Sequence, residues 1–116
     1  PMDALTLARV MQWLAVAGNE ILYGLARARA AIQFKAPWNI LEAQAQGKQA
    51  LALLDAHLAQ HTWLAATHPT IADIACYPYA ALAQQAELPL EQYPSVVAWI
   101  RRVQAWPNYL GMPGML

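Results

Sequence analysis

Apolar side chains recur every three or four residues along most of this 116-residue chain, and this spacing constrains the fold more than any other feature. From Leu5 to about Ala31 the apolar residues fall on one face of a single helix. β-Branched residues never alternate with polar ones over a useful length, so we expect no strands. The pattern predicts an all-α protein whose first helical face comprises Leu7, Val10, Met11, Leu14, Ala17, Ile21, Leu25 and Ala28.

Proline, glycine and polar segments divide the rest of the chain into three further helices. After a loop over residues 33–39, we expect helices over about residues 40–60, 70–86 and 95–106. Residues 1–116 are therefore predicted to form one domain, a bundle of four main helices. The expected core faces of the three later helices comprise Gly47, Leu51, Leu54, Leu58, Ile71, Ile74, Ala75, Leu82, Val96, Trp99, Ile100 and Val103.

Charge and composition exclude several classes of protein. Apolar residues make up 59% and charged residues 12%, with seven charges of each sign. A net charge of zero gives no long-range attraction to nucleic acid or to an anionic membrane. No apolar run reaches the ~18 residues that a membrane span needs, and no signal peptide is recognisable. We therefore expect a cytoplasmic protein with neither nucleic acid nor membrane as its partner.

Residues that bind metals or act as nucleophiles are few. Cys76 is the single cysteine, which excludes an internal disulfide and a thiolate zinc cluster. His57 and His61 stand four residues apart, as metal-binding pairs on helices do, but only Asp55 is near and it lies on another face. His68 is expected in a loop. We predict no metal site and no catalytic residue.

The segment "HPTIADIACYPY", residues 68–79, carries most of the remaining polar groups. Thr70 and Asp73 have the spacing of a capping box at a helix start, and Pro69 with Ile74 is placed for a hydrophobic staple. Pro78 is expected to kink this helix. The residues expected to pack in the core or in an interface are Cys76, Tyr77 and Tyr79.

Two segments resemble the C-terminal helical domain of glutathione transferases. They are "WLAATHPTIADIACYPYAAL", residues 63–82, and "YPSVVAWIRRVQAWP", residues 93–107. Residues 10–21 and 51–65 are similar to the family more weakly, so the resemblance covers essentially the whole chain. Ala66 stands where the family usually has glycine, and Leu22 and Tyr23 stand where beta-class enzymes carry a His-Lys pair.

The resemblance implies a role in a larger protein. In the family, a thioredoxin-like domain precedes this one, binds glutathione and carries the residue that activates its thiol; no such segment is recognisable in this sequence. The helical domain would form one wall of the hydrophobic co-substrate pocket and part of the interdomain and homodimer interfaces. The parent reaction would join glutathione to a small apolar electrophile, and this chain alone would bind no cofactor and have no activity.

The resemblance also suggests which residues form that wall, and it leaves other functions open. A protein-interaction module of the same fold and a binder of small apolar ligands are the alternatives. Arg27 and Arg29 are expected to be solvated, whereas Arg101 or Arg102 could bond loop carbonyls. The tail with Tyr109, Leu110, Met112 and Met115 either caps the pocket or is a disordered end. The predicted pocket wall comprises Trp13, Ala15, Asn19, Leu22 and Tyr23.

Overall fold

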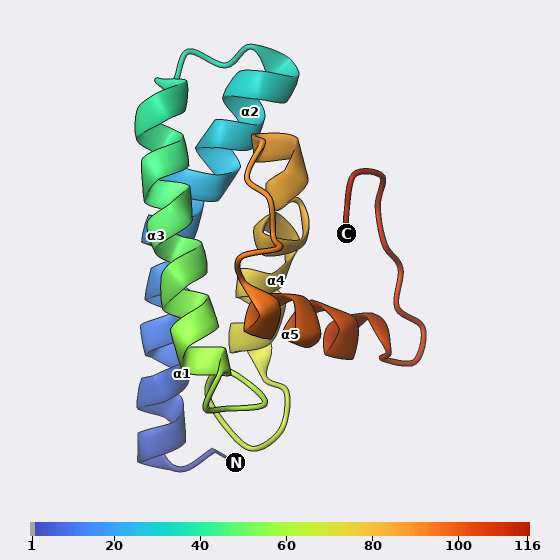
Figure 1. The fold of residues 1–116 in the computed structure, drawn as a ribbon. Coiled ribbons are helices and arrows are strands. Elements are labelled where there is room, and N and C mark those ends of the chain that lie inside the picture. The colour runs from blue at the N-terminus through green and yellow to red at the C-terminus, as the bar shows by residue number, and fades with distance from the viewer. Residues whose placement is uncertain (1) are drawn as a thin grey trace.

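The longest helical rod of the computed structural model runs from Ala4 to Phe34 (Figure 1). It consists of α1 (Ala4–Val16), a π-helix η1 (Ala17–Ala26) and α2 (Arg27–Phe34), joined without a break because the linking residues are all helical. The structure describes residues 2–116, so Pro1 of the expected single domain lies outside the described residues. The last residue of the rod, Phe34, lies three residues beyond the predicted end at Ala31.

Three more main helices complete the bundle, and the prediction of an all-α fold with four main helices is confirmed. They are α3 (Ile40–Leu58), α4 (Ile71–Ala81) and α5 (Pro94–Gln104), with a short 3₁₀ helix η2 (Ala83–Ala86) after α4. None of the described helices has the length and apolar character needed to cross a membrane. The stretch 70–86, predicted as one helix, consists of the α-helix α4 followed by the separate 3₁₀ helix η2.

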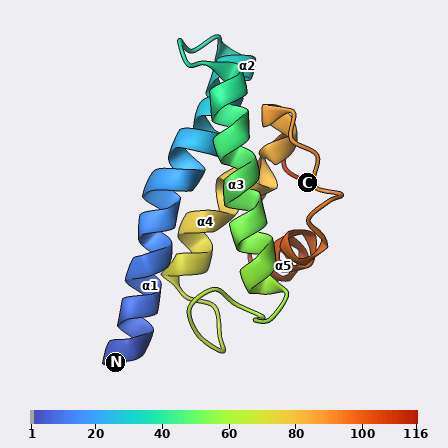
Figure 2. The ribbon, with the colours of Figure 1, turned by 60° about the vertical axis from the view of Figure 1, so that its left-hand side comes forward.

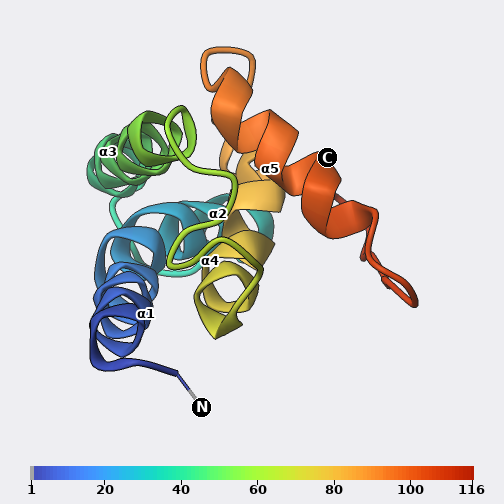
Figure 3. The same cartoon turned by 90° about the horizontal axis from the view of Figure 1, so that it is seen from below.

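The first rod and α3 form an antiparallel pair, with η1 packed along α3 (Figure 2). The helix α4 packs against α1 and η1, and α5 runs crosswise to α3, as the view from below also shows (Figure 3). The two backbones come close together at Gly24 and Gly47: a Cβ added to Gly24 would lie 2.4 Å from the Gly47 amide nitrogen. Glycine is therefore required at this crossing.

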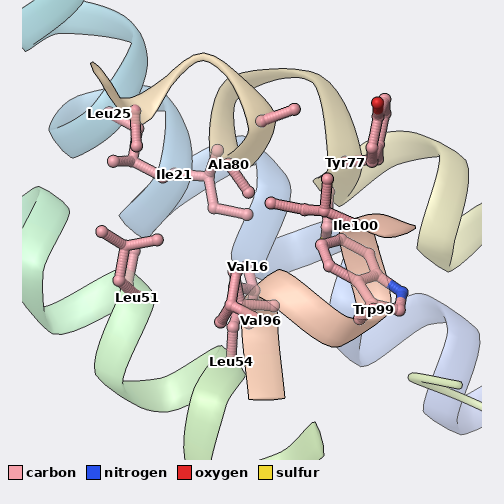
Figure 4. Packing of buried hydrophobic residues seen from close by; sticks show 14 of the residues in the cluster. Val16, Ile21, Leu25, Leu51, Leu54, Tyr77, Ala80, Val96, Trp99 and Ile100 are labelled. Atoms are coloured by element: carbon pink, nitrogen blue, oxygen red, sulfur yellow. The ribbon is translucent and has the colours of Figure 1, made fainter. Parts of the chain in front are cut away.

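The core lies where η1, α3, α4 and α5 meet (Figure 4). Ile21 and Leu25 from η1 face Leu51 and Leu54 from α3, while Trp99 from α5 is fully buried beside α4. All the predicted core residues of α3 and α5 are buried, so their expected faces are confirmed.

The predicted faces of the first helix and of α4 are partly wrong. Leu7 and Met11 are 50% and 59% exposed, because the buried face of α1 is formed by Val10, Trp13 and Val16 instead. Ile71 and Ile74 are each 57% exposed. The helix α4 is central as predicted, but its buried residues are Ala72, Asp73, Cys76, Tyr77, Ala80 and Ala81.

A carboxylate from α3 fixes the position of α5. The N-cap residue of α5, Tyr93, provides no side-chain cap. Instead Asp55 Oδ1 accepts hydrogen bonds from the amides of Ser95 at 2.8 Å and Val96 at 3.1 Å. These amides belong to the unpaired first turn of a helix, so Asp55 stabilises that end and joins two helices that are far apart in the sequence.

Candidate functional site

Three of the five predicted wall residues lie in a π-helix. Asn19, Leu22 and Tyr23 belong to η1, and Ala15 lies just before it in α1. The π-helix is a rare conformation that occurs frequently at functional sites. Its wider turn changes which side chains share a face, so the spacing rule for α-helices does not fix the orientation of these residues.

The structure divides the predicted wall residues into two groups. Ala15, Asn19, Leu22 and Tyr23 are exposed, with Leu22 at 43% and Tyr23 at 39%. Trp13, by contrast, is 4% exposed and packs against His57, with the ring centroids 4.7 Å apart. Trp13 therefore supports this stretch of helix from the core side, whereas the other four present a mostly apolar surface to solvent.

Two polar side chains accompany this surface. The Asn19 amide donates a hydrogen bond of 2.7 Å to the Glu20 carboxylate. The ring of Tyr23 lies 4.2 Å from the Arg27 guanidinium, which also lies 3.9 Å from the ring of Trp38. Arg27 is thus held by two aromatic rings rather than solvated as predicted. The hydroxyl of Tyr23 makes no hydrogen bond within residues 2–116 and is available to a ligand.

Two other arginines also make defined contacts. Arg29 is half-buried and donates to the Gln85 side chain at 2.6 Å, so the prediction that it is solvated is wrong. Arg102 donates to the carbonyl of Thr62 at 2.7 Å, which confirms the prediction of an arginine bonded to a loop carbonyl. Both contacts join segments far apart in the sequence. A pattern of neighbouring residues therefore does not reveal these partners.

Cys76 is unsuited to nucleophilic chemistry. It is fully buried, and its Sγ lies 3.4 Å from the carbonyl oxygen of Trp13. Burial, followed by the nearby negative charges of Asp73 and Glu20, raises the pKa of the Cys76 thiol to about 12. The thiol is therefore protonated at neutral pH, as expected of a small buried side chain rather than a reactive cysteine.

The predicted capping box of α4 is present and is part of a larger network. Thr70 Oγ1 accepts from the Ala72 amide at 3.1 Å, and Asp73 Oδ2 accepts from the Thr70 amide at 3.0 Å. Asp73 Oδ1 also accepts from the Leu64 amide at 3.1 Å and from Trp99 Nε1 at 2.9 Å. Asp73 is fully buried, so these donors satisfy a carboxylate that cannot reach water. We infer a structural role for it.

His57 in α3 and His61 just after it lie against each other. His57 and His61 are stacked with ring centroids 4.3 Å apart, and His57 Nε2 donates to the Leu64 carbonyl at 2.8 Å. Within residues 2–116 no three metal-binding side chains come together. His57 instead positions the connector between α3 and α4, with its pKa lowered first by burial and further by the charges of His61 and Arg9. His68 lies in this connector, as expected for a loop residue.

The C-terminal tail is docked on the bundle. The amide of Leu116 donates to the Ala81 carbonyl at 3.0 Å, and Gln104 Nε2 donates to the Leu116 carbonyl at 2.9 Å. The hydroxyls of Tyr77 and Tyr109 are hydrogen-bonded, and Met115 packs beside both of them. Of the predicted tail residues, Leu110 and Met112 remain exposed. The tail thus covers the ends of α4 and α5 and is not a free end. None of these contacts involves a predicted wall residue.

The fold and the capping network define a helical domain of the kind found in transferases that use glutathione. The family model for the glutathione S-transferase C-terminal domain matches residues 25–102. The chain therefore belongs to the glutathione S-transferase C-terminal domain family, which confirms the family that the two sequence motifs indicated.

Solved structures and one curated protein are similar to this chain. A glutathione S-transferase from Xanthobacter autotrophicus Py2 superposes with a TM-score of 0.90 at 31% identity, over 98% of this chain and 58% of that one. A glutathione S-transferase from Pseudomonas fluorescens Pf-5 gives 0.90 at 27% identity, over 97% and 59%. The disulfide-bond oxidoreductase YfcG of Escherichia coli K12 is 30% identical over 71 residues, 61% of this chain and 33% of that protein. The chain thus spans little more than half of the solved relatives and a third of the curated one.

Proposed function

We propose that this domain forms the apolar co-substrate wall of a glutathione transferase and the surface on which a thioredoxin-like domain packs. The exposed stretch of helix with Ala15, Asn19, Leu22 and Tyr23 carries the proposal. Its apolar side chains offer a surface for an apolar electrophile, and Asn19 and Tyr23 offer hydrogen bonds that would orient it.

Further exposed apolar residues support a domain that works with a partner. Ile71 and Ile74 on α4 are more than half exposed, and α4 packs beside α1. Large exposed apolar patches mark interaction surfaces in soluble proteins. We assign the α4 surface to the thioredoxin-like domain, which would bring glutathione and the residue that activates its thiol. The cytoplasm, where glutathione is abundant, is the compartment that this reaction requires.

A second surface is suited to homodimer formation. The turn between α2 and α3 exposes Phe34, Trp38, Ile40 and Leu41, with Leu41 at 78%. Four apolar side chains gathered at one end of a helical hairpin would be covered by a second copy of the chain. We propose this hairpin end as part of the dimer interface.

The reaction of the full protein has two candidates. The solved relatives are named as glutathione S-transferases, which favours conjugation of glutathione to an apolar electrophile. The curated relative is a disulfide-bond oxidoreductase, which favours thiol–disulfide exchange in place of conjugation. In either reaction the thiolate would belong to glutathione or to the partner domain, because the Cys76 thiol is buried and protonated.

The test compares this chain alone with the protein extended by its natural upstream coding sequence. Conjugation of glutathione to chlorodinitrobenzene and glutathione-dependent reduction of hydroxyethyl disulfide would be measured side by side. We expect no activity from the chain alone and one of the two activities from the extended protein. Conjugation by the chain alone would contradict the proposal. An upstream sequence without a thioredoxin-like segment would favour the interaction module.

A further inference from the structure

A pocket lies away from the predicted wall, between η2 and α5. Its volume is about 790 Å³, within the range of small-molecule sites, and it shares no residue with the predicted co-substrate wall. The floor is apolar: Leu88 and Leu90 are buried, while Val97 and Leu116 are half-buried and close the sides. The proposed transferase reaction makes no use of this pocket.

The walls of the pocket are held in place before any ligand binds. Leu116 is fixed at both backbone groups, by the Ala81 carbonyl at 3.0 Å and by Gln104 Nε2 at 2.9 Å. On the other side, the Leu88 amide donates to the Ala83 carbonyl at 3.0 Å. Preformed walls reduce the ordering that a ligand must impose when it binds.

Two residues with carboxylate side chains lie among those that line this apolar pocket. Glu87 and Glu91 are the charged residues among those that line it, and both are exposed. Neither carboxylate accepts a hydrogen bond from any group within residues 2–116, so both are free to meet a ligand. Apolar walls concentrate the field of like charges beside them, which attracts a cation and repels an anion.

Glu87 lies at a backbone position where glycine would be preferred. It follows η2 as the C-cap, with φ 58° and ψ 35°, in the left-handed region where glycine is preferred. A substitution to glycine would relieve the backbone and remove the carboxylate. This position therefore allows the charge to be removed without a loss of stability.

We propose that the pocket binds a small organic cation, a ligand with an apolar body and a protonated amine. The apolar body would lie on Leu88, Leu90 and Val97, and the ammonium group would lie between Glu87 and Glu91. An isolated inorganic cation would leave the apolar floor unused, and an apolar anion would meet two like charges. The inference is independent of the glutathione reaction, since it concerns other residues.

Three probes of one size and different charge test the proposal on this chain. They are phenethylammonium, 2-phenylethanol and phenylacetate, titrated by NMR at neutral pH and low salt. We expect phenethylammonium to shift resonances around Leu88 and Val97 and to bind about tenfold more tightly than 2-phenylethanol. Phenylacetate should bind most weakly, and added salt should reduce the preference for the cation.

Charge variants complete the test. Glu87→Gln with Glu91→Gln should abolish the preference for phenethylammonium over 2-phenylethanol, and Glu87→Gly should weaken cation binding in a protein at least as stable. Glu42→Gln, which removes an exposed carboxylate from the first turn of α3, is the matched control and should bind like the parent chain. The proposal is overturned if no probe binds, if the neutral or anionic probe binds as tightly, or if the preference survives the double variant.

Discussion

The Asp73 carboxylate at the start of α4 accepts a hydrogen bond of 2.9 Å from the indole Nε1 of Trp99 on α5. The same oxygen accepts from the Leu64 amide in the connector before α4. One buried side chain thus joins a helix start, a loop and a second helix. We therefore expect Asp73 to determine folding rather than chemistry.

Asp73→Ala should therefore lower the free energy of unfolding strongly. It removes a helix cap and leaves two buried N–H donors without acceptors, which together cost about 3–5 kcal/mol. Urea unfolding followed by circular dichroism measures the change. Asp3→Ala is the control, since Asp3 caps α1 with a single exposed bond of 2.7 Å and its loss should have a much smaller effect. Normal stability and refolding of Asp73→Ala would refute the assigned role.

Gly24 and Gly18 lie in the same π-helix and should respond to alanine in opposite ways. A Cβ at Gly24 would overlap the backbone of Gly47, so Gly24→Ala should destabilise the protein by about 1–3 kcal/mol. A Cβ at Gly18 has no neighbour within 4 Å, so Gly18→Ala should stabilise it by about 0.5–1 kcal/mol. Thermal melting of the two variants measures both. Equal effects would show that η1 and α3 do not cross at Gly24.

Stability should fall in mild acid because of His57. Burial is the main cause of its lowered pKa, and the charges of His61 and Arg9 act in the same direction. The unfolded chain, with a value near 6.5, then binds a proton more readily than the folded one. The contribution of His57 is complete above pH 6.5 and is lost as the pH falls from there through the lowered folded pKa. Urea midpoints across this range should show less pH dependence for His57→Gln, whose amide can still donate to Leu64, and an unchanged slope would contradict the assignment.

Cys76 should be unreactive in the folded protein. Burial raises the pKa of its thiol from 9.0 to about 12, so its contribution to stability is present below pH 9.0 and declines as the pH rises toward 12. Labelling by dithionitrobenzoate near neutral pH should occur only at the rate of unfolding and should become complete in urea. Rapid labelling of the native protein would show that the thiol is accessible.

The sequence predicted the parts of the fold that depend on local patterns. The capping box of Thr70 and Asp73 marks the start of α4, and Gly47 with the leucines after it marks the buried face of α3. The exposure of Leu7, Met11, Ile71 and Ile74 was not predictable, because periodicity identifies an apolar side of a helix but not which sides receive a partner.

Polar contacts between residues far apart in the chain could not be predicted from the sequence either. Asp55 was considered only as a residue near the histidine pair on another face of the helix, yet it caps α5, forty residues away. Only one feature of the sequence pointed to the hydrogen bond from Trp99 to Asp73. Trp99 was expected in the core, and a buried indole N–H requires an acceptor. Within the predicted wall, the α-helical spacing could not separate buried Trp13 from exposed Leu22 and Tyr23, because a π-helix begins between them.

The most direct test of the proposed co-substrate wall is the kinetics of Leu22→Ala in the extended, active protein. Leu53→Ala is its matched control, because Leu53 on α3 has the same exposed fraction, 43%. We expect Leu22→Ala to lower kcat/KM for an apolar electrophile by about tenfold while the KM for glutathione is unchanged, and Leu53→Ala to alter neither. Equal kinetics for the two variants, or a change confined to glutathione, would contradict the assignment of this surface to the co-substrate.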